Sequence, residues 1–379
     1  MTDYKKFGYH FIDNEFFEFY CDPSVYKEIV DGDSVYVSGT FNGWINGSDS
    51  SWLLKKTIRK GKVFYLLQKK IADIDVPGNS GFPEFRFYVI SSDGHHVLKE
   101  NPDEKNVFLN NRLILKDKED IEFVKKLKSF KIVKTMEDFN LDCPACRSEI
   151  ANFRLTPGTS CLYRGYHPYK RSRPELDTED SRLDYVLKAL EKYGIQSDIT
   201  LSGYEVASSY ENEKMPEIIE KIENNENRLC VDIDYNLVYF HSDAAEFSNI
   251  LRTISRFIIS KPAPFYIHCR LGSDRTGVTC AIFAALCGAS WEEIAEDYEK
   301  TSNCGIGEYR NRKLLSYSLK RMIGYAPESA SNLCHLMQSY FLKENILSAE
   351  ELEKLVKKLS SLEEKRESDF FDFAGKHIC

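Results

Sequence analysis

One segment of the chain combines residue types and spacing that suit covalent chemistry. An apolar run at 265–267 is followed by His268 and Cys269, and Arg275 comes six positions after the cysteine. A helix is expected to begin at Thr276. A loop that turns tightly from a strand into a helix aims successive backbone N–H groups at one point, where they can bind an oxyanion. The segment therefore predicts attack of a cysteine thiolate on a phosphate ester.

Each residue type in this loop suits a step of that reaction. Inward amides and the helix dipole stabilise the Cys269 thiolate, and the planar fork of Arg275 can grip two phosphate oxygens. Gly272 permits a close approach of the backbone, and the Thr276 hydroxyl is placed to hydrogen-bond the sulfur. The remaining residues of the predicted phosphate-binding loop are His268, Arg270, Leu271 and Ser273.

A cysteine and an arginine separated by five residues also occur by chance and in sulfur-transfer enzymes. The histidine before Cys269, the glycine three positions after it and the Arg275-Thr276-Gly277 closure favour phosphate. The structural alternative is a buried cysteine in a strand-to-helix turn.

The elements that must position this loop follow from hydrophobic periodicity. Apolar spacing predicts a helix over 181–193, and buried strands are expected at 228–233 and 265–267, an alternation typical of an α/β sheet. Turn-separated β-branched and aromatic runs at 35–39, 63–67, 85–89 and 112–115 predict a β-sandwich instead. A capping box at 348–351 opens a C-terminal helix. The expected organisation is a β-sandwich at 1–118, a charged linker at 119–149, an α/β domain at 150–326 and a helical extension at 327–379 that packs on it.

The composition of the chain argues against several classes of function. The 379 residues carry a net charge of −8, which argues against a general binder of nucleic acid or anionic membranes. Eleven cysteines are too sparse for a disulfide scaffold. The longest apolar stretch, at 278–289, is shorter than a membrane span, and no apolar leader follows Met1. A cytoplasmic protein is expected.

From about Asn152 to Leu359 the chain resembles the bacterial-type, atypical protein-tyrosine phosphatases, whose loop reads His-Cys-x-x-Gly-Lys-Asp-Arg-Thr-Gly. Further matches lie at 152–154, 162–165 and 288–298. The resemblance implies a cysteine-phosphatase fold with a central, mostly parallel sheet and flanking helices. It also implies a phosphocysteine intermediate, no metal and no cofactor.

Two departures from the family pattern concern charge. Ser273 stands where the family usually has Lys, which removes a positive charge associated with acidic substrates such as phosphoinositides. Thr200 stands where the family often has an Asp at a strand end, so that acid is either lost or displaced to Asp198.

The leaving oxygen needs a proton, and a positioned aspartate contributes about 10²–10⁴-fold to such a step. The resemblance favours Asp274, since the family places an Asp just before the loop arginine; the alternative role for Asp274 is to fix the loop through a neighbouring arginine. Rival acids flank the expected strand at Val231, and they are Asp232, Asp234 and Asp243.

Three other groups allow both a functional and a structural interpretation. Arg164, Lys170, Arg171 and Arg173 either attract phosphorylated substrate or form an ordinary solvated loop. Cys143 and Cys146 are interpreted as two incidental thiols, because a second pair at zinc spacing is missing. The histidines at 95, 96 and 167 are expected to be surface or hydrogen-bonding residues.

The segment at 35–44, with further matches at 85–89, 93–94 and 109–114, resembles the glycogen-binding modules of AMP-activated kinase β subunits, which are Ig-like sandwiches. The resemblance implies a glycan site in which Trp44 is an aromatic platform, Arg86 replaces a Lys and Asn110 supplies an amide. Sugar rings stack on such aromatic faces. The second platform tryptophan is not matched, so a module without a sugar site is the alternative, and the alternative for Trp44 is a core residue.

Three functions compete. The first is a cysteine phosphatase acting on phosphotyrosine or another phosphoprotein. The second is a glycan-targeted phosphatase acting on phosphorylated glycogen- or starch-like polyglucan. The third is a scaffold that binds phosphate or glycan without turnover. Sulfur transfer remains a fourth, less favoured reaction.

Overall fold

The chain divides into two units in the computed structural model, which describes residues 8–26, 29–99, 110–112, 122–123, 126–127, 129–203 and 214–360. The first unit comprises residues 1–132 and 309–317, and the second comprises 133–308 and 318–379. The division at residue 132 falls within the predicted linker at 119–149. Nothing in the sequence predicts that residues 309–317 join the first unit.

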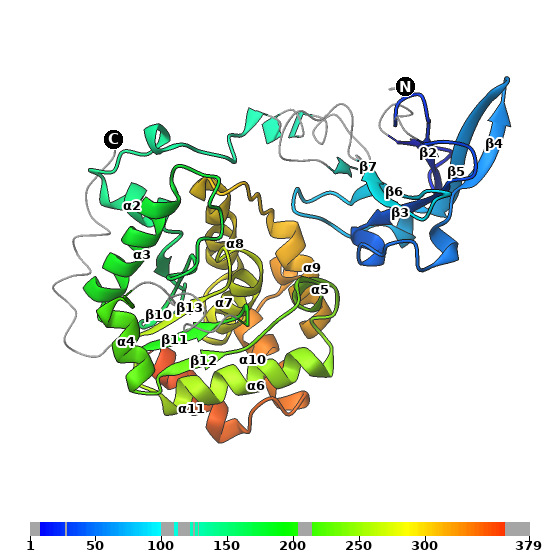
Figure 1. Ribbon diagram of the computed structural model, residues 1–379. Coiled ribbons are helices and arrows are strands. Elements are labelled where there is room, and N and C mark those ends of the chain that lie inside the picture. Colours follow the sequence, from blue (N-terminus) through cyan, green and yellow to red (C-terminus); the bar gives the residue numbers. More distant parts are fainter. Residues whose placement is uncertain are drawn as a thin grey trace. The chain divides into compact units, whose positions relative to one another are not determined.

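The first unit contains two antiparallel sheets (Figure 1). One sheet has the strand order β1 (Tyr9–Phe11), β2 (Phe16–Cys21), β5 (Lys62–Lys70) and β4 (Lys55–Arg59). The other has the order β3 (Ser34–Gly39), β6 (Glu84–Ile90) and β7 (His96–Lys99), and β8 (Asn111–Arg112) pairs with β6.

Alternating aromatic and β-branched residues build one core between the two sheets. Phe17 and Phe19 of β2 are buried with Phe85 and Phe87 of β6, and the ring centroids of Phe19 and Phe85 lie 4.9 Å apart. This is the period-2 pattern of strands with one buried face. The predicted strands at 35–39, 63–67 and 85–89 are confirmed; of the strand predicted at 112–115, the part from 113 onward lies outside the described residues. The antiparallel β class of the unit is confirmed, and its Ig-like topology stays a prediction.

The second unit is built on a five-stranded sheet. Its strand order is β12 (Arg228–Cys230), β11 (Ser197–Thr200), β13 (Phe265–His268), β10 (Leu162–Gly165) and β9 (Arg154–Leu155). The first four are parallel and β9 is antiparallel. Within the described ranges, the α-helices are α2 (Pro144–Ile150), α3 (Glu179–Lys192), α4 (Glu217–Asn224), α5 (Tyr235–Phe240), α6 (Ala245–Ser260), α7 (Asp274–Leu286), α8 (Trp291–Lys300), α9 (Arg312–Ile323), α10 (Leu333–Lys343) and α11 (Ala349–Ser360). A mostly parallel sheet with flanking helices is as predicted.

The helix that follows Cys269 is the most buried helix of this unit. Every residue of α7 from Thr276 to Leu286 is buried, and α5, α8 and α10 pack against it. A helix that is apolar all round must be covered all round, which explains the long apolar stretch noted in the sequence. Within the described ranges, no helix is long and apolar enough to cross a bilayer.

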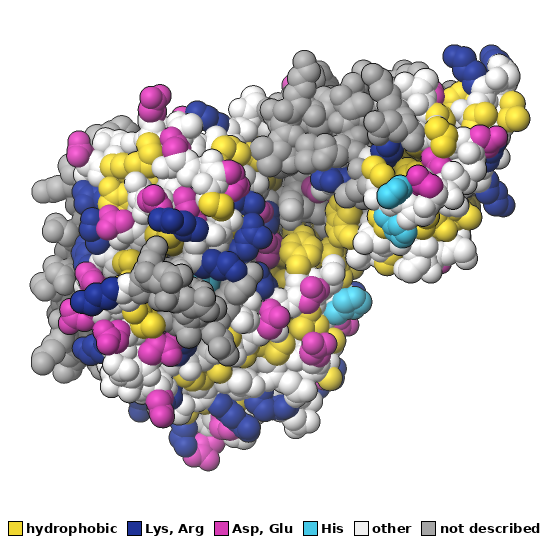
Figure 2. All heavy atoms as spheres, viewed as in Figure 1, with side chains coloured by type: hydrophobic (Ala, Val, Ile, Leu, Met, Phe, Trp, Pro, Cys, Tyr) yellow, Lys and Arg dark blue, Asp and Glu magenta, His cyan; other side chains and the backbone are white. Residues whose placement is uncertain are grey.

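Local signals at the helix ends are confirmed. The helix expected at 181–193 is α3, and Gly194 just after it has a φ of 60°. The Ser348 hydroxyl accepts from the Glu351 amide at 3.2 Å, and the Glu351 carboxylate accepts from the Ser348 amide at 2.9 Å. Beyond this capping box, α11 packs on α6. Figure 2 shows basic and acidic side chains intermixed over the face in view, in keeping with the moderate net charge.

Candidate active site

The predicted phosphate loop lies at the carboxyl end of the central strand. β13 runs between β11 and β10, both parallel to it, and Cys269 follows its last residue while α7 begins at Asp274. Ligands of open α/β sheets bind outside the carboxyl ends of the strands. Cys269 is only 3% exposed, so the loop surrounds the sulfur.

Gly272 shows why this loop needs a glycine. Its φ is 72°, and a Cβ added there would lie 2.2 Å from the carbonyl oxygen of Gly165, the last residue of β10. No side chain fits at that distance. The loop backbone therefore packs directly against the end of the neighbouring strand.

The loop carbonyls are held from outside by two buried side chains. Asn152 donates to the Leu271 carbonyl at 3.0 Å, and Arg164 donates to the Gly272 carbonyl at 2.8 Å. In a trans peptide the C=O and N–H point in opposite directions. Anchoring these carbonyls outward consequently turns the amides of the next residues toward the inside of the loop.

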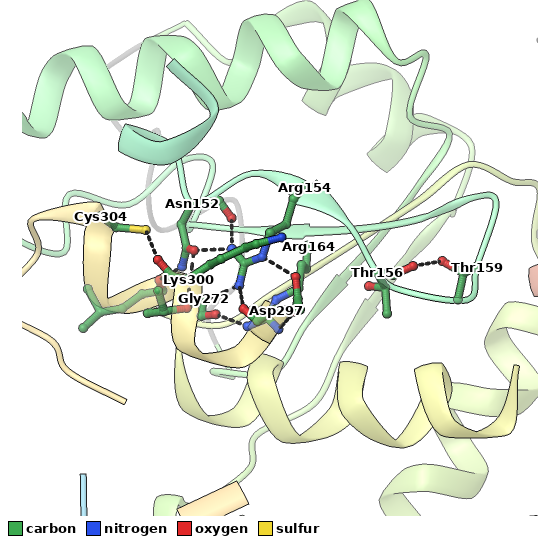
Figure 3. A network of polar contacts seen from close by, with 11 residues as sticks. Asn152, Arg154, Thr156, Thr159, Arg164, Gly272, Asp297, Lys300 and Cys304 are labelled. Carbon is green, nitrogen blue, oxygen red and sulfur yellow. Dashed lines mark hydrogen bonds and ion pairs between the residues drawn. The ribbon is translucent and has the colours of Figure 1, made fainter. Parts of the chain in front are cut away.

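A buried carboxylate organises the two arginines of this support (Figure 3). Asp297 of α8 forms ion pairs of 2.5 Å with Arg154 of β9 and with Arg164 of β10. Arg154 also donates to the Asn152 backbone carbonyl at 3.0 Å. Burial disfavours the charged form of Asp297, but the two guanidinium groups outweigh it and hold the pKa of Asp297 below its ordinary value.

The structure shows the surroundings of three of the four cations in the basic cluster at 164–173. Arg164 is buried and binds Asp297, and Arg173 donates to the Ile306 carbonyl at 3.0 Å and pairs with Glu308 at 2.8 Å. Arg171 pairs with Asp180 at the surface. Arg164 and Arg173 are therefore structural ties, whereas Arg171 is an exposed member of a surface ion pair.

A second buried cluster surrounds His268, the residue before Cys269. The imidazole Nε2 of His268 is 3.1 Å from a carboxylate oxygen of Asp198 in β11, and Tyr169 donates to Asp198 at 3.4 Å. The His268 ring also packs edge-on against His167. Burial, aided by His268, lowers the pKa of His167 well below its ordinary value, so His167 stays neutral. Asp198 is thus a buried partner of His268.

Arg275 is fixed by the ends of two strands. Its guanidinium donates to the Leu201 carbonyl at 3.2 Å and to the Ile233 carbonyl at 3.3 Å, just beyond β11 and β12. The Asp232 carboxylate lies 3.9 Å from the same nitrogen. The arginine is therefore oriented by backbone groups at the edge of the sheet where the loop lies.

The four candidate acids have different surroundings. Asp274 accepts a hydrogen bond of 2.8 Å from the buried Tyr239 hydroxyl, which in turn bonds Tyr298 at 2.7 Å. Asp232 is 78% exposed beside Arg275. Asp234 caps α5 through the Asn236 amide, and Asp243 pairs with Arg321. Of these four acids, Asp274 directly precedes Arg275 in the chain, and Asp232 contacts the Arg275 guanidinium.

Two buried hydroxyls of the loop have no hydrogen-bond partner among the described residues. Among the described residues, the buried hydroxyls of Ser273 and Thr276 make no hydrogen bond. The expected bond from Thr276 to the Cys269 sulfur is therefore not made. Arg270 donates to the Ser172 carbonyl at 3.2 Å, and the Ser172 hydroxyl donates to the Arg270 carbonyl at 3.1 Å, so the start of the loop is tied to the 172 segment.

Several of these supporting residues were missed by sequence reasoning. Asn152 and Asp297 carried a signal only as part of the family-like segments at 152–154 and 288–298. Glu179, which is buried and accepts from the Ser172 amide at 2.6 Å and from the Tyr166 hydroxyl at 2.9 Å, carried none.

The predicted glycan residues lie in the first unit, at one end of the β3–β6 pair. Arg86 donates to Asn110 at 2.6 Å, and Asn110 donates to Glu84 at 2.8 Å. The Trp44 amide donates to the Gly39 carbonyl at 2.9 Å and so closes the turn after β3. Gly39 follows Ser38, the β3 partner of Arg86. Trp52, in contrast, is in the core and stacks on Phe41.

Comparison with known proteins supports a phosphatase. Residues 173–361 match a tyrosine phosphatase family. The matched region contains Cys269 and Arg275 but begins after Asn152, Arg154 and Arg164, which support the loop. No curated protein matches the chain.

Among solved structures, the chain is similar to the core catalytic domain of the PP-IP phosphatase SIW14 from S. cerevisiae, in complex with citrate. The identity is 15%, the match covers 52% of this chain and 94% of that one, and the TM-score is 0.26. So slight a likeness carries no argument about fold or substrate.

Replacing Asp297 by Asn should strongly destabilise the second unit, since the buried guanidinium group of Arg164 and the half-buried one of Arg154 would lose their counterion. We expect the free energy of unfolding in denaturant to fall by about 3–5 kcal/mol. Asp184→Asn removes the exposed carboxylate that pairs with Lys188 and is the control, with a change below about 1 kcal/mol. Equal losses in the two variants would contradict the role given to Asp297.

Replacing Gly272 by Ala should displace the loop, because its Cβ would overlap the Gly165 carbonyl. We expect kcat/KM for an aryl phosphate to fall about 10²-fold or more. Gly288→Ala is the matched control: its φ is 86°, but nothing lies within 4 Å of the added Cβ. It should retain activity, and a comparable loss in Gly288→Ala would show that close packing is not what matters.

Proposed function

We propose that the chain is a cysteine-dependent phosphatase that hydrolyses phosphomonoesters through a phosphocysteine intermediate, with phosphotyrosine in proteins as its substrate. One observation carries the proposal. The backbone between Cys269 and Arg275 has its carbonyls at Leu271 and Gly272 tied outward, which leaves the inside of the loop to amide donors. That arrangement suits a tetrahedral oxyanion.

The proposed reaction has two steps. The Cys269 thiolate attacks phosphorus, and the bond from phosphorus to the ester oxygen breaks while an aspartic acid protonates the leaving oxygen. Water then attacks the phosphocysteine, its proton returns to the aspartate, and phosphate and the thiolate are released. Arg275 and the buried hydroxyls of Ser273 and Thr276 supply further hydrogen-bond donors to the phosphoryl oxygens.

Charge and burial support an aryl phosphate over a polyanionic substrate. The sulfur is deeply buried, so an extended phenol ring reaches it better than a short side chain. Ser273 brings no positive charge to the loop, and the exposed carboxylate of Asp232 lies beside Arg275. A negative group at this position disfavours a substrate that carries several phosphates.

Asp274 is the proton donor in this proposal, and Asp232 is the alternative. Tyr239 fixes the orientation of the Asp274 carboxyl group, whereas Asp232 is exposed and contacts the arginine. Asp274 precedes Arg275 in the chain and Asp232 contacts its guanidinium, so activity with different leaving groups must separate the two acids.

Cys269→Ser should abolish turnover of phosphotyrosine peptides and of a generic aryl phosphate. Asp274→Asn should lower kcat for phosphotyrosine about 10²–10⁴-fold but affect an ester with an acidic leaving phenol much less, because that phenol departs without a proton. Asp232→Asn should change neither. Retained turnover in Cys269→Ser would overturn the proposal, and the reverse pattern for the two aspartates would assign the acid to Asp232.

The bond between Arg86 and Asn110, with Trp44 in the turn that follows β3, favours a second candidate, a phosphatase targeted to phosphorylated polyglucan. Wild-type protein should then bind amylose or glycogen in a pull-down and release phosphate from phosphorylated starch. Trp44→Ala should lose the binding, while Ile58→Ala, an exposed apolar residue of the same unit, should keep it. Failure of wild type to bind either glucan would remove this candidate.

A further inference from the structure

A pocket lies between α2 and α3, two helices that pack against each other (Figure 1). Its volume is about 280 Å³, close to the lower end of the range for ligand pockets, about 300–1,000 Å³. One side is formed by Tyr185, Lys188, Ala189 and Lys192, which recur on one face of α3. No residue of the phosphate loop lines the pocket. It is therefore a second concave site of this unit.

The hollow exists because small side chains face it. Ala151, which ends α2, and Ala189 in α3 both line the pocket. Alanine has no atoms beyond Cβ that could fill the space between two packed helices, whereas protein interiors are normally filled. A longer apolar side chain at position 189 would occupy the space that a ligand needs.

Aromatic rings form another part of the wall. The buried ring of Phe153 stacks on that of Tyr193, with centroids 5.4 Å apart and planes inclined by 21°. Tyr185 and Tyr193 are half-buried, so part of each side chain stays accessible. The ammonium groups of Lys188 and Lys192 lie 5.7 Å and 5.2 Å from the ring centroids of these tyrosines. A flat aromatic ring can pack against such a wall.

The charge of the pocket is positive in a chain whose net charge is −8. Three cations line it, and among the described residues no carboxylate does. Lys188 pairs with Asp184 at 2.6 Å, and Arg147 donates to the backbone carbonyl of Asp142 at 3.1 Å. Within the described part of the chain, neither Arg147 nor Lys192 forms an ion pair with a carboxylate. The pocket thus combines aromatic surface with positive charge that an anion can neutralise.

We propose that this pocket is a binding site for a small aromatic anion, a molecule of one or two rings that carries a carboxylate, sulfonate or phosphate group. Its rings pack against the aromatic wall and the two alanines, and its anionic group faces the three cations. The site does not depend on the proposed phosphatase reaction. It nevertheless borders the support of the phosphate loop, because Phe153 directly follows Asn152, which donates to the Leu271 carbonyl.

The probe for this site is 2-naphthalenesulfonate, which has two fused rings and one negative charge and contains no phosphate ester. Calorimetric titration of the full-length protein should show one site, with an affinity about tenfold higher than that for the neutral analogue 2-naphthol. The affinity for the sulfonate should fall as salt is added, since exposed charges are screened. Equal affinities for the two compounds, or no binding of the sulfonate, would overturn the proposal.

Lysine substitutions test the contribution of charge. The double variant Lys188→Gln and Lys192→Gln should bind the sulfonate about tenfold more weakly than wild type. The matched control is Lys343→Gln with Lys354→Gln, which removes two lysines of α10 and α11 that pair with carboxylates at the surface. It should bind as wild type does. An equal loss in both double variants would show that the probe responds only to net charge.

Filling the hollow tests its shape without changing any charge. Ala189→Leu should weaken binding of the sulfonate about tenfold or more, because the added carbons occupy the space between the helices. Ala145→Leu adds the same carbons at an exposed position of α2 outside the pocket wall and should leave binding unchanged. Full binding by Ala189→Leu would place the probe elsewhere.

The phosphate loop is the other place where a sulfonate could bind. If the pocket is the site, Arg275→Ala should bind the probe as wild type does. The probe should also slow amide hydrogen exchange at 148–153 and 185–193, and not at 269–276. Loss of binding in Arg275→Ala, with protection confined to the loop, would overturn the proposal. These measurements require no turnover, so the pocket and the proposed phosphatase activity can fail separately.

Discussion

The architecture of this site depends on a buried carboxylate, Asp297, and the two guanidinium groups that face it, of which that of Arg164 is buried and that of Arg154 is half-buried. Asp297 can remain charged inside the second unit only because Arg154 and Arg164 face it, and each arginine is acceptable there only because of Asp297. Because Arg164 is held by Asp297 and also donates to the Gly272 carbonyl, the ion pair fixes the position of that carbonyl. The conformation of the loop therefore depends on a helix, α8, and on two strands far from Cys269 in the sequence.

The same arrangement explains the choice of residues in the loop itself. Because the loop is drawn against the end of β10, position 272 has no room for a Cβ. Because α7 is covered by α5, α8 and α10, its first turn and the loop before it have few ways to move. A rigid scaffold reduces the reorganisation needed when charge develops on a bound oxyanion, which is the physical basis for the proposed catalysis.

The loop and its flanking elements could be predicted because their chemistry requires certain residue types at fixed spacing. Apolar periodicity and capping residues are local signals in the sequence. They therefore also predicted β13, α7, α3 and the capped helix α11. The antiparallel strands of the first unit followed from β-branched and aromatic runs. The sugar-binding role of Trp44, Arg86 and Asn110 rests on resemblance and stays a proposal.

The supports of the loop could not be predicted in the same way. Arg164 belongs to a short run of basic residues, and such a run usually lies on the solvent-exposed surface. In the structure, however, Arg164 lies in β10, a strand whose four residues are all buried. Asp297 lies in an amphipathic helix with several other acidic residues, so the sequence gives no sign that this one is buried and the others are not. The partnership of these two residues spans more than a hundred positions, and no local pattern reports it. Similarly, Asp198 resembled a strand-end acid because sequence alone does not show that it faces His268.

The most direct test of the central claim is to trap the covalent intermediate. Wild-type enzyme turning over an aryl phosphate can be quenched in acid, and the peptide spanning 257–270, whose only cysteine is Cys269, analysed by mass spectrometry. The account predicts one phosphoryl group on this peptide, on sulfur, during turnover and none after substrate is exhausted. Steady turnover with the phosphoryl group on another residue, or with Cys269 remaining open to alkylation throughout, would contradict it.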